Sequence, residues 1–330
     1  MSIDKHTELP HRIRAGLWIL GACIGLFGII GNITAFIGFQ KQNKNTSTSF
    51  LFKSLAIADT FVIVTTNLTN LQIYLDSYIK HHYFALGKTI FEIRNMAILS
   101  SNGITVLLTV TRFIAVCFPL KTVSVCSIKR VRYYLVATLM FSIVCFIPDI
   151  VITRILITNQ FVTHEEISIS SYLRYLIVFE PLVVFVIPLL IITSLTIILI
   201  IKLKFLNTLR QTTIRANRHR NNATKVLIVV NIVFIVCTLP WPVTYILHYS
   251  GYTKPACIIS ETVSTFHNVN SSLNFLIYML FSKQYREVVK QNCMCFHRGE
   301  DCDPIRENIQ VGNGGQRMTD QNIINRETRL

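Results

Sequence analysis

Four ionisable residues stand inside long apolar stretches of the sequence. Asp59 lies in the run Leu55-Ala-Ile-Ala-Asp59 and Arg112 in TVTRFIAVCFPLK, while Arg94 and Glu180 lie near the ends of two further stretches. A charge at membrane depth is costly and normally faces a protein interior or an aqueous cavity, so each is a functional candidate. For Arg94 and Glu180 two interpretations remain open: a mutual ion pair or snorkelling toward water, and binding of a ligand.

Small polar residues accompany these charges. The set is Asn32, Ser101, Asn270, Ser271 and Asn274. They are placed to converge on the Asp59 carboxylate from other apolar stretches, and an oxygen-rich cluster around a buried carboxylate suits a small hard cation. The alternative is ordinary hydrogen bonding between membrane helices, worth about 0.6 kcal/mol per pair.

Long helices in a membrane would position these residues. Of the 330 residues, 51% are hydrophobic and only 15% are charged, whereas soluble proteins carry about 25% charged residues. A membrane-spanning helix needs about 20 mostly apolar residues. The stretches that qualify are Ala15–Phe39, Phe50–Leu75, Thr89–Phe118, Val131–Thr153, Tyr175–Ile201, Val226–Tyr249 and Cys257–Phe281.

The predicted fold is therefore an all-α membrane protein, a seven-transmembrane helix bundle with a short amphipathic eighth helix. We divide the chain into an extracellular segment (1–14), the seven-helix domain (15–281), a juxtamembrane amphipathic helix with a cysteine cluster (282–298) and a disordered cytosolic tail (299–330). The eighth helix would lie on the inner leaflet and contact membrane lipids.

Lysine and arginine in the loops predict the orientation. One side carries Lys121, Lys129, Arg130, Arg132, Lys202, Lys204, Arg210, Arg215, Arg218, Arg220 and Lys225. The other side carries only Lys80, Lys88, Arg154, Arg174 and Lys254. The N-terminus is therefore predicted outside a plasma membrane and the C-terminus in the cytosol. The net charge of +15 reflects this topology, so we expect no nucleic-acid partner.

Other function classes find little support. The sequence contains no nucleophile elbow, phosphate-binding loop or HExxH motif, so we predict that the chain is not an enzyme. A transporter or channel is the main alternative of another class, and the absence of internal repeats weakens it.

Several short motifs occur in order along the predicted helices. They are Gly31-Asn32, Leu55-Ala-Ile-Ala-Asp59, Thr111-Arg112-Phe113, Pro188, Cys237-Thr-Leu-Pro240 and Asn274-Phe-Leu-Ile-Tyr278. Together they resemble the signatures of rhodopsin-like (class A) G-protein-coupled receptors. The Asn-Phe-x-x-Tyr form, and a span-six motif that lacks tryptophan, also resemble invertebrate FMRFamide-type neuropeptide receptors.

The resemblance implies a receptor that binds an extracellular ligand, expected to be a peptide, and activates a heterotrimeric G protein. The residues expected to carry coupling and switching are Arg112, Thr111, Tyr278, Asn274, Pro240, Phe234 and Pro188. The resemblance also implies a sodium pocket formed by Asp59, Ser101, Asn270 and Ser271, with no other cofactor. Arrestin is a further expected partner.

The chain departs from the family pattern at its outer end. Gly87 stands where the family has a cysteine bonded to the second extracellular loop, and residues 156–173 contain no cysteine. The usual disulfide is therefore not expected, and a β-hairpin is permitted in this loop. The tryptophan expected in span four is also absent.

Further departures concern the switch. Thr111 replaces an acidic neighbour of Arg112, and Arg220 stands where some relatives place a glutamate. Neither residue restrains Arg112 through a salt bridge, so we hypothesise elevated basal activity. Asn102 replaces an apolar residue beside Pro188 and Phe234, and Thr196 replaces a common tyrosine.

Arg94 argues against two ligand classes. It stands where amine receptors place an aspartate, and Asn268 stands where light receptors need a lysine. An arginine suits a carboxylate, a phosphate or an acidic group of a peptide. The expected companions are Glu180, Tyr74, Trp241, Tyr245, His248, Glu261 and His267. Ordinary packing is the alternative for the aromatic residues, Glu180 or Glu261 is an alternative anchor for a peptide amide, and a small anionic or lipid ligand is the alternative ligand class.

The C-terminal segment carries two further candidate sites. Cys293 and Cys295 follow the basic juxtamembrane helix, a setting that suits S-palmitoylation better than metal binding. Thr328 and Leu330 end the chain in a pattern that suits capture by a PDZ-domain protein, although such an ending also arises by chance. A receptor-like protein without G-protein coupling remains a third interpretation of the chain.

Overall fold

The computed structural model describes residues 5–41, 46–79, 84–158, 179, 181–209, 216–243, 256–282, 285–287 and 289–290. Within these ranges every element of regular secondary structure is a helix. The helices are α1 (Lys5–Lys41), α2 (Ser47–Ile79), α3 (Phe84–Cys117), α4 (Pro119–Val125), α5 (Ile128–Thr158), η1 (Leu182–Val186), α7 (Ile187–Leu209), α8 (Ala216–Thr238) and α10 (Ala256–Phe281).

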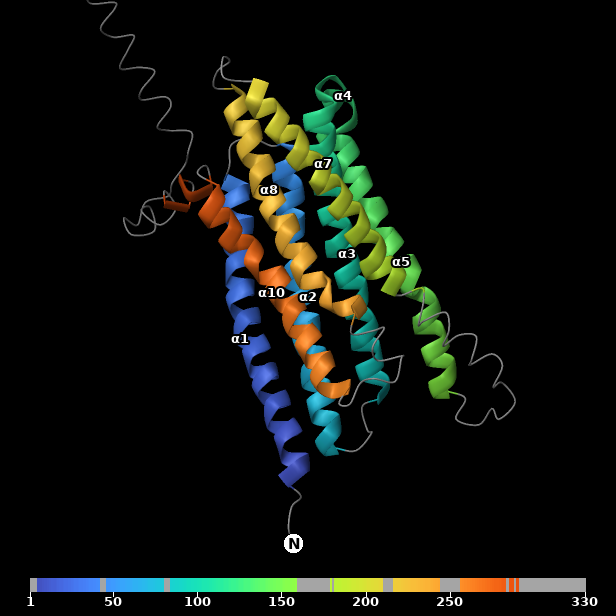
Figure 1. Cartoon of the computed structure of the whole chain (residues 1–330). Coiled ribbons are helices and arrows are strands. Elements are labelled where there is room, and N and C mark those ends of the chain that lie inside the picture. Colours follow the sequence, from blue (N-terminus) through green and yellow to red (C-terminus); the bar gives the residue numbers. More distant parts are fainter. Residues whose placement is uncertain are drawn as a thin grey trace, which may run out of the picture.

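The long helices lie side by side as one bundle (Figure 1). Helix α3 is central and packs against α2, α5, α7 and α8, while α1 packs against α2 and α10. Six of the described helices are long and apolar enough to cross a membrane. Helix α10 completes the bundle as the seventh member, and its more polar sequence faces inward, where Ser271, Ser272 and Asn274 are buried. The predicted seven-helix membrane fold is confirmed.

The outer surface of the bundle is apolar. Large aliphatic side chains such as Ile30, Leu190 and Ile201 are more than half exposed, in segments that are otherwise continuously hydrophobic. In a bilayer the lipid chains take the place of water around such side chains. The same surface would be an aggregation hazard for a protein in water.

Several helices extend beyond the predicted stretches, and one helix was not predicted. Helix α1 begins at Lys5, ten residues before the predicted start at Ala15, and so includes much of the segment expected to precede the bundle. The connection between α3 and α5 contains the short helix α4, which the sequence did not indicate. Pro119 at the first position of α4 explains its start, because proline is preorganised for the first turn of a helix.

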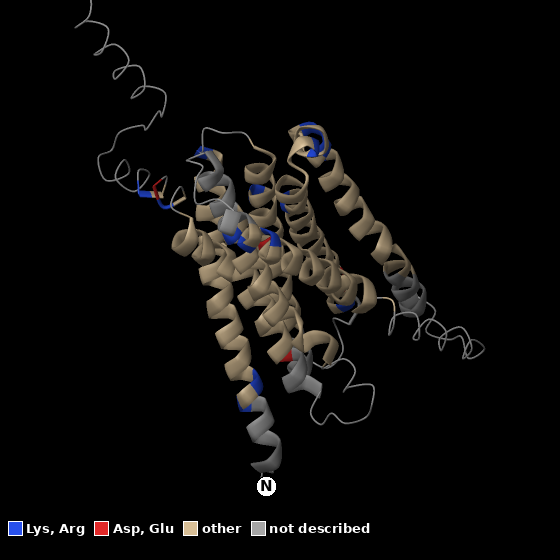
Figure 2. Cartoon of the chain, turned by 45° about the horizontal axis from the view of Figure 1, so that its top comes forward, with Lys and Arg blue, Asp and Glu red and all other residues tan. Residues whose placement is uncertain are grey.

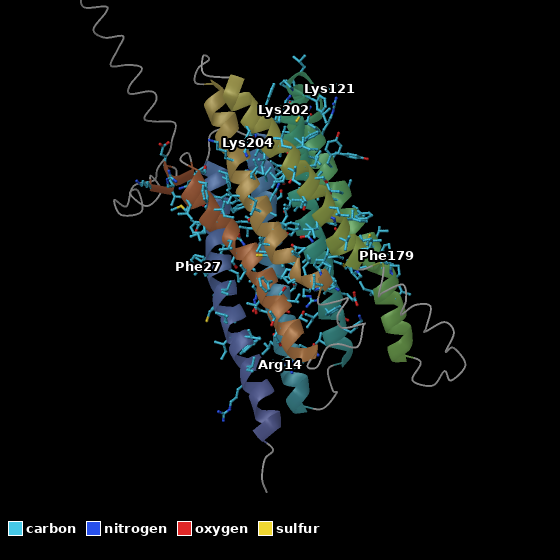
Figure 3. The ribbon with its side chains drawn as sticks, viewed as in Figure 1. Arg14, Phe27, Lys121, Phe179, Lys202 and Lys204 are labelled. Carbon is cyan, nitrogen blue, oxygen red and sulfur yellow. The ribbon has the colours of Figure 1, made fainter. Side chains whose placement is uncertain are left out.

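The loop charges gather mainly at the end of the bundle that carries α4, opposite the N-terminus (Figure 2). Lys121, Lys202 and Lys204 project from this end, whereas Arg14 lies toward the other (Figure 3). At the α4 end Ser282 caps the start of the eighth helix, since its Oγ accepts a 3.2 Å hydrogen bond from the Tyr285 amide. Arg286 donates to the carbonyls of Met279 and Leu280 at the end of α10.

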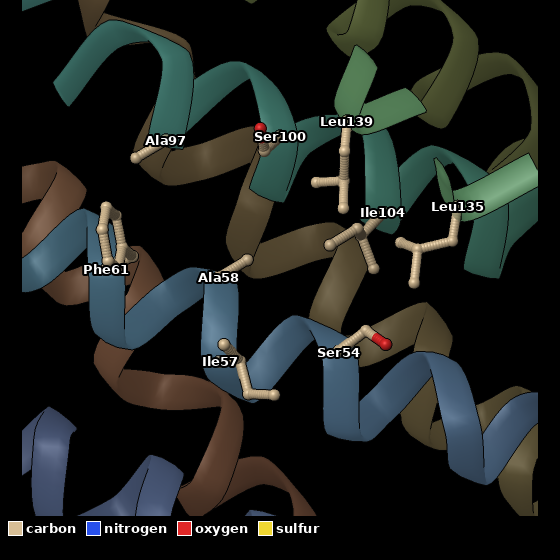
Figure 4. Close-up of a pocket in the computed structure, with 9 residues that line it drawn as sticks. All are labelled: Ser54, Ile57, Ala58, Phe61, Ala97, Ser100, Ile104, Leu135 and Leu139. Carbon is tan, nitrogen blue, oxygen red and sulfur yellow. The ribbon is translucent and has the colours of Figure 1, made fainter. Parts of the chain in front are cut away.

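A groove of about 330 Å³ lies between α2, α3 and α5 on the lipid-facing side (Figure 4). Its lining consists of Ser54, Ile57, Ala58, Phe61, Ala97, Ser100, Ile104, Leu135 and Leu139. Ser54 and Ser100 donate to carbonyls of their own helices, those of Phe50 and Met96. The groove therefore presents hydrocarbon with no free donor, as expected of a surface that faces acyl chains.

Glycines on α1 let α10 approach closely. A Cβ at Gly28 would lie 2.0 Å from Ser272 Oγ, and one at Gly31 would lie 2.9 Å from Phe275 Cβ. The space left at Gly28 admits the Ser272 hydroxyl, which donates a 3.1 Å hydrogen bond to the Ile24 carbonyl. Small residues at helix interfaces play this part generally in membranes, where close packing drives helix association.

We predict that Gly28→Ala lowers the thermal unfolding midpoint of the detergent-purified protein by several degrees, because overpacking costs about 1–3 kcal/mol. Gly16→Ala is the matched control on the same helix, since nothing lies within 4 Å of its added Cβ. Equal midpoints for the two variants would contradict the observed α1–α10 contact.

Candidate functional site

The centre of the bundle holds the Asp59 carboxylate, which is only 1% exposed. Ser101 Oγ on α3 donates to Oδ1 over 2.6 Å, and Asn274 Nδ2 on α10 donates to Oδ2 over 2.6 Å. The Ser271 hydroxyl is a third hydrogen-bond partner. Three of the residues that the sequence singled out are thus brought together with Asp59 across three helices.

Two other members of the predicted cluster take different positions. Asn32 Nδ2 donates to the Ser271 backbone carbonyl over 3.1 Å, so it ties α1 to α10 without bonding Asp59. Asn270 is only partly buried. None of the ion pairs within the described ranges includes Asp59. Its charge is therefore opposed only by neutral donors, and a proton or a small cation is needed to compensate it at membrane depth.

Asn102 donates to a carbonyl that Pro188 leaves unpaired in the fifth transmembrane helix, which comprises η1 and α7. Pro188 has no N–H to donate to the carbonyl of Val184, four residues earlier. The helix widens to π-helical η1 over Leu182–Val186, a known way to absorb such a defect. Asn102 Nδ2 on α3 then donates to the Val184 carbonyl over 2.8 Å. This polar replacement at the predicted switch is thus accounted for by a backbone acceptor that needs a partner.

The half of the bundle away from α4 contains the predicted ligand residues Arg94, Trp241 and His267. The Arg94 guanidinium is buried, lies 4.3 Å from the centre of the Phe91 ring and donates to Asn95 Oδ1 over 3.1 Å. The Phe185 ring stacks on Trp241 at 3.9 Å and lies 5.5 Å from His267. His267 Nε2 is buried and has no hydrogen-bond partner among the residues that the structure describes. A cation, this imidazole nitrogen and stacked aromatic rings therefore share this region.

Glu261 is engaged by a residue that sequence reasoning missed. Its Oε1 lies 3.3 Å from Arg14 Nε, and the glutamate side chain is 4% exposed. Glu261 Oε2 and Arg14 Nη2 are buried and have no hydrogen-bond partner in the described part of the chain. The pair joins the early turns of α1 to α10, and no local sequence signal links positions so far apart.

Glu92 is the second missed acid. Its carboxylate is buried and lies 2.5 Å from Lys88 Nζ, one helical turn earlier on α3. The spacing of four residues is the available sequence signal for this pair. Asn95 and Phe185, which contact Arg94 and Trp241, carry no distinguishing signal of their own.

At the α4 end Arg112 makes no ion pair within the described part of the chain, and its Nε is buried without a partner. Thr111 Oγ1 donates to the Leu108 carbonyl of its own helix, so it does not contact the arginine. Cys126 Sγ lies 3.9 Å from the Thr111 carbonyl. Burial raises the pKa of the Cys126 thiol and the nearby Arg112 cation opposes this, so the thiol is a neutral neighbour.

Aromatic rings surround Tyr278. Phe39, Phe52 and Tyr285 have ring centres 5.2, 5.0 and 5.9 Å from that of Tyr278. The Tyr285 ring, from the eighth helix, fits against Gly38, where a Cβ would lie 2.6 Å from it. The cluster joins α1, α2, α10 and the eighth helix at the same end as Arg112. Pro188 and Phe234 are buried, and α8 ends at Thr238, just before Pro240.

Several predicted site residues lie outside the described residues. They are Glu180, Tyr245, His248, Cys293, Cys295, Thr328 and Leu330, together with the side chain of Tyr74 and the loop 159–178. The proposed roles of these residues, and the Arg94–Glu180 pair, stay predictions.

We predict that Arg14→Gln destabilises the protein by at least about 1 kcal/mol, up to the 3–5 kcal/mol typical of a fully buried pair, because it leaves the Glu261 charge uncompensated. The double variant Arg14→Gln/Glu261→Gln should regain most of the loss in thermal unfolding midpoint. Additive losses in this double-mutant cycle would show that the two side chains do not interact.

Comparisons with known proteins agree with this geometry. The Drosophila melanogaster FMRFamide receptor is 24% identical over 310 residues, which cover 86% of this chain and 55% of that receptor, so the match spans about half of the relative's length. The Gallus gallus thyrotropin-releasing hormone receptor is 23% identical, covering 94% of this chain and 86% of the relative. The Sus scrofa growth hormone secretagogue receptor type 1 is 25% identical, covering 85% and 81%.

The family-level comparison covers most of the chain. Residues 31–279 match the 7 transmembrane receptor (rhodopsin family) profile. This range contains all the motifs from Gly31 to Tyr278, and it confirms the predicted resemblance. The family is one of receptors, which agrees with the prediction that the chain is not an enzyme. The chain is a multi-pass membrane protein and belongs to the rhodopsin family of seven-transmembrane receptors.

Proposed function

We propose that the chain is a plasma-membrane receptor for an extracellular amidated peptide and that it activates a heterotrimeric G protein. The observation that carries the proposal is the shared outer region of Arg94, His267 and the Phe185–Trp241 stack. The relatives named for FMRFamide and thyrotropin-releasing hormone support a peptide ligand. Basic loop residues at the end opposite Arg14 support an extracellular N-terminus.

The chemistry of the outer region suits the parts of a short amidated peptide. The Arg94 guanidinium offers donors to backbone and amide carbonyls. The partly exposed Trp241 ring, stacked on the buried Phe185 ring, offers an apolar surface to aromatic side chains, which favour offset stacking. Glu261 Oε2, which has no hydrogen-bond partner among the described residues, is a further acceptor for a peptide N–H.

Activation is a population shift between two helix packings. A ligand that binds better to the active packing favours an outward swing of α8 about Pro240. The swing opens the α4 end of the bundle beside Arg112 and Tyr278, where the G protein would bind. Arg112 has no ion pair to break among the described residues, so its guanidinium is available to that partner.

A small anionic ligand is the second candidate. Arg94 carries a buried guanidinium that lies over the Phe91 ring and donates to Asn95 Oδ1. A carboxylate or phosphate would match the planar, paired donors of a guanidinium.

We also propose that sodium binds beside Asp59 and favours the inactive packing. The donor set fits a small hard cation, since Asp59 supplies a buried carboxylate and Ser101 and Ser271 supply hydroxyl oxygens. One bound cation would compensate a charge that only neutral groups now face.

We predict that replacing potassium by sodium at constant ionic strength raises the unfolding midpoint of the purified receptor by a few degrees, because a ligand that binds only the folded state stabilises it. Asp59→Asn should abolish the difference between the two salts. Identical midpoints in sodium and potassium for the unaltered receptor would rule out the sodium site.

The function itself is tested by G-protein activation in cells that express the receptor, challenged with a panel of amidated peptides and of small carboxylates. We predict a response to a peptide, and loss of at least nine tenths of that response in Arg112→Ala at equal surface expression. Arg94→Gln should raise the half-maximal peptide concentration about tenfold or more, given the strength of charge-assisted bonds, without reducing surface expression.

A response to carboxylates alone that depends on Arg94 would show that the ligand is a small anion and not a peptide. Silence toward every compound, together with no basal activity, would contradict a coupled receptor.

A further inference from the structure

Three buried polar side chains join α3, α7 and α8 where the surrounding residues are apolar. Asn231 Nδ2 on α8 donates to Thr196 Oγ1 on α7 over 2.8 Å and to Thr109 Oγ1 on α3 over 3.1 Å. Asn231 and Thr109 are 0% exposed and Thr196 is 3% exposed. We call these three residues the Asn231 triad.

The hydrogen bonds of the triad are chemically consistent. Thr109 has one hydroxyl hydrogen, which it donates to the Thr105 carbonyl over 2.8 Å. Its oxygen is then free to accept from Asn231, and Thr196 accepts the second amide hydrogen. Both N–H groups of a buried amide are thereby satisfied, and both are satisfied by other helices.

The neighbours of Asn231 on α8 show that this amide is an exception. Leu227, Val230 and Phe234 are buried apolar residues one turn before it, beside it and one turn after it. An asparagine among them is costly unless its amide is paired. The closed contact of α8 with α3 and α7 supplies that pairing, so the amide favours this packing over one that separates the helices.

We propose that the Asn231 triad is the restraint that holds α8 against α3 and α7 and so sets the basal activity. The triad takes the place of an ion pair at Arg112, which Thr111 does not provide. This inference rests on the proposed function for its biological meaning, and it reverses the expectation of high basal activity that the missing acid suggested.

The distance between Asn231 and Pro240 along α8 makes the triad sensitive to an outward swing of this helix. Asn231 lies nine residues before Pro240, or about 13 Å along a helix at a rise of 1.5 Å per residue. A tilt of about 20° at the proline, the size of a distinct kink, moves Asn231 by about 5 Å. Hydrogen bonds do not survive such a displacement, so opening breaks both bonds together.

The expected effect follows from measured bonds between membrane helices. Each is worth about a threefold shift in an equilibrium, so two bonds shift the population of the open packing about eightfold. Asn231→Leu should therefore raise basal G-protein activation several-fold and leave the maximal ligand-stimulated response unchanged. Thr196→Val should raise it two- to threefold.

Matched variants separate the hydrogen bond from packing. Thr196→Val keeps the shape of the side chain but removes the acceptor. Thr196→Ser keeps the acceptor, so its basal activity should equal that of the unaltered receptor. Thr105→Val is the control on α3, because Thr105 is also buried and, among the described residues, its hydroxyl donates only to the Ser101 carbonyl of its own helix. It should leave basal activity unchanged.

A second measurement does not depend on coupling. Spin labels attached through an unnatural amino acid at exposed positions 225 on α8 and 123 on α4 report the distance between the two elements in purified receptor. Asn231→Leu should increase the population of longer distances several-fold, and Thr196→Val should do so about threefold.

The two readouts distinguish the possible failures. Longer distances without G-protein activation in any variant would support the triad and overturn the proposed coupling. Unchanged distances and unchanged basal activity in both Asn231→Leu and Thr196→Val, at normal surface expression, would overturn the triad as a restraint while leaving the receptor function intact.

Discussion

Hydrocarbon offers no hydrogen bonds, so a buried polar group in this bundle is costly unless it finds a partner on another helix or on its own backbone. Asp59 is the clearest case, since Ser101 and Asn274 approach its two oxygens from α3 and α10. The same demand brings the α10 side chain of Ser272 onto an α1 carbonyl, through the space left by Gly28. Pairing of polar groups therefore fixes how the helices are rotated and how closely they approach, which apolar packing against lipid does not determine.

The switching elements follow from the same constraint. Pro188 lacks a backbone N–H, so the Val184 carbonyl loses its usual helical donor. The Asn102 amide donates to that carbonyl, and a π-helical turn accommodates the change. Helix α8 ends at Thr238, just before Pro240, the pivot proposed above. Between Pro240 and the α4 end, the described hydrogen bonds of α8 to α3 and α7 join neutral groups, which suits a bundle with two packings of similar free energy. Several hydrogen bonds of modest strength hold one packing without making the other inaccessible.

Much of this arrangement was predictable from sequence, because apolar stretches of the right length mark membrane helices and charged residues within them mark their inner faces. Asp59, Ser101 and Asn274 were found in this way. The Asn231 triad and the Arg14–Glu261 pair were not. Both depend on the relative rotation and height of helices that are distant in sequence, and no local pattern encodes these quantities. The early start of α1 was missed for a related reason, since its first turns are polar and are joined to α10 by the Arg14–Glu261 pair.

The most direct test of the proposed switch is a structure of the receptor bound to a G protein, determined by electron cryomicroscopy. We expect α8 to have swung outward about Pro240, Asn231 to have left Thr109 and Thr196, and Arg112 to face the G protein. We expect the hydrogen bonds of Asp59 and Asn102 to be retained in part, because they join helices other than α8. A bound G protein with α8 in its present place and the Asn231 bonds intact would contradict the proposed switch.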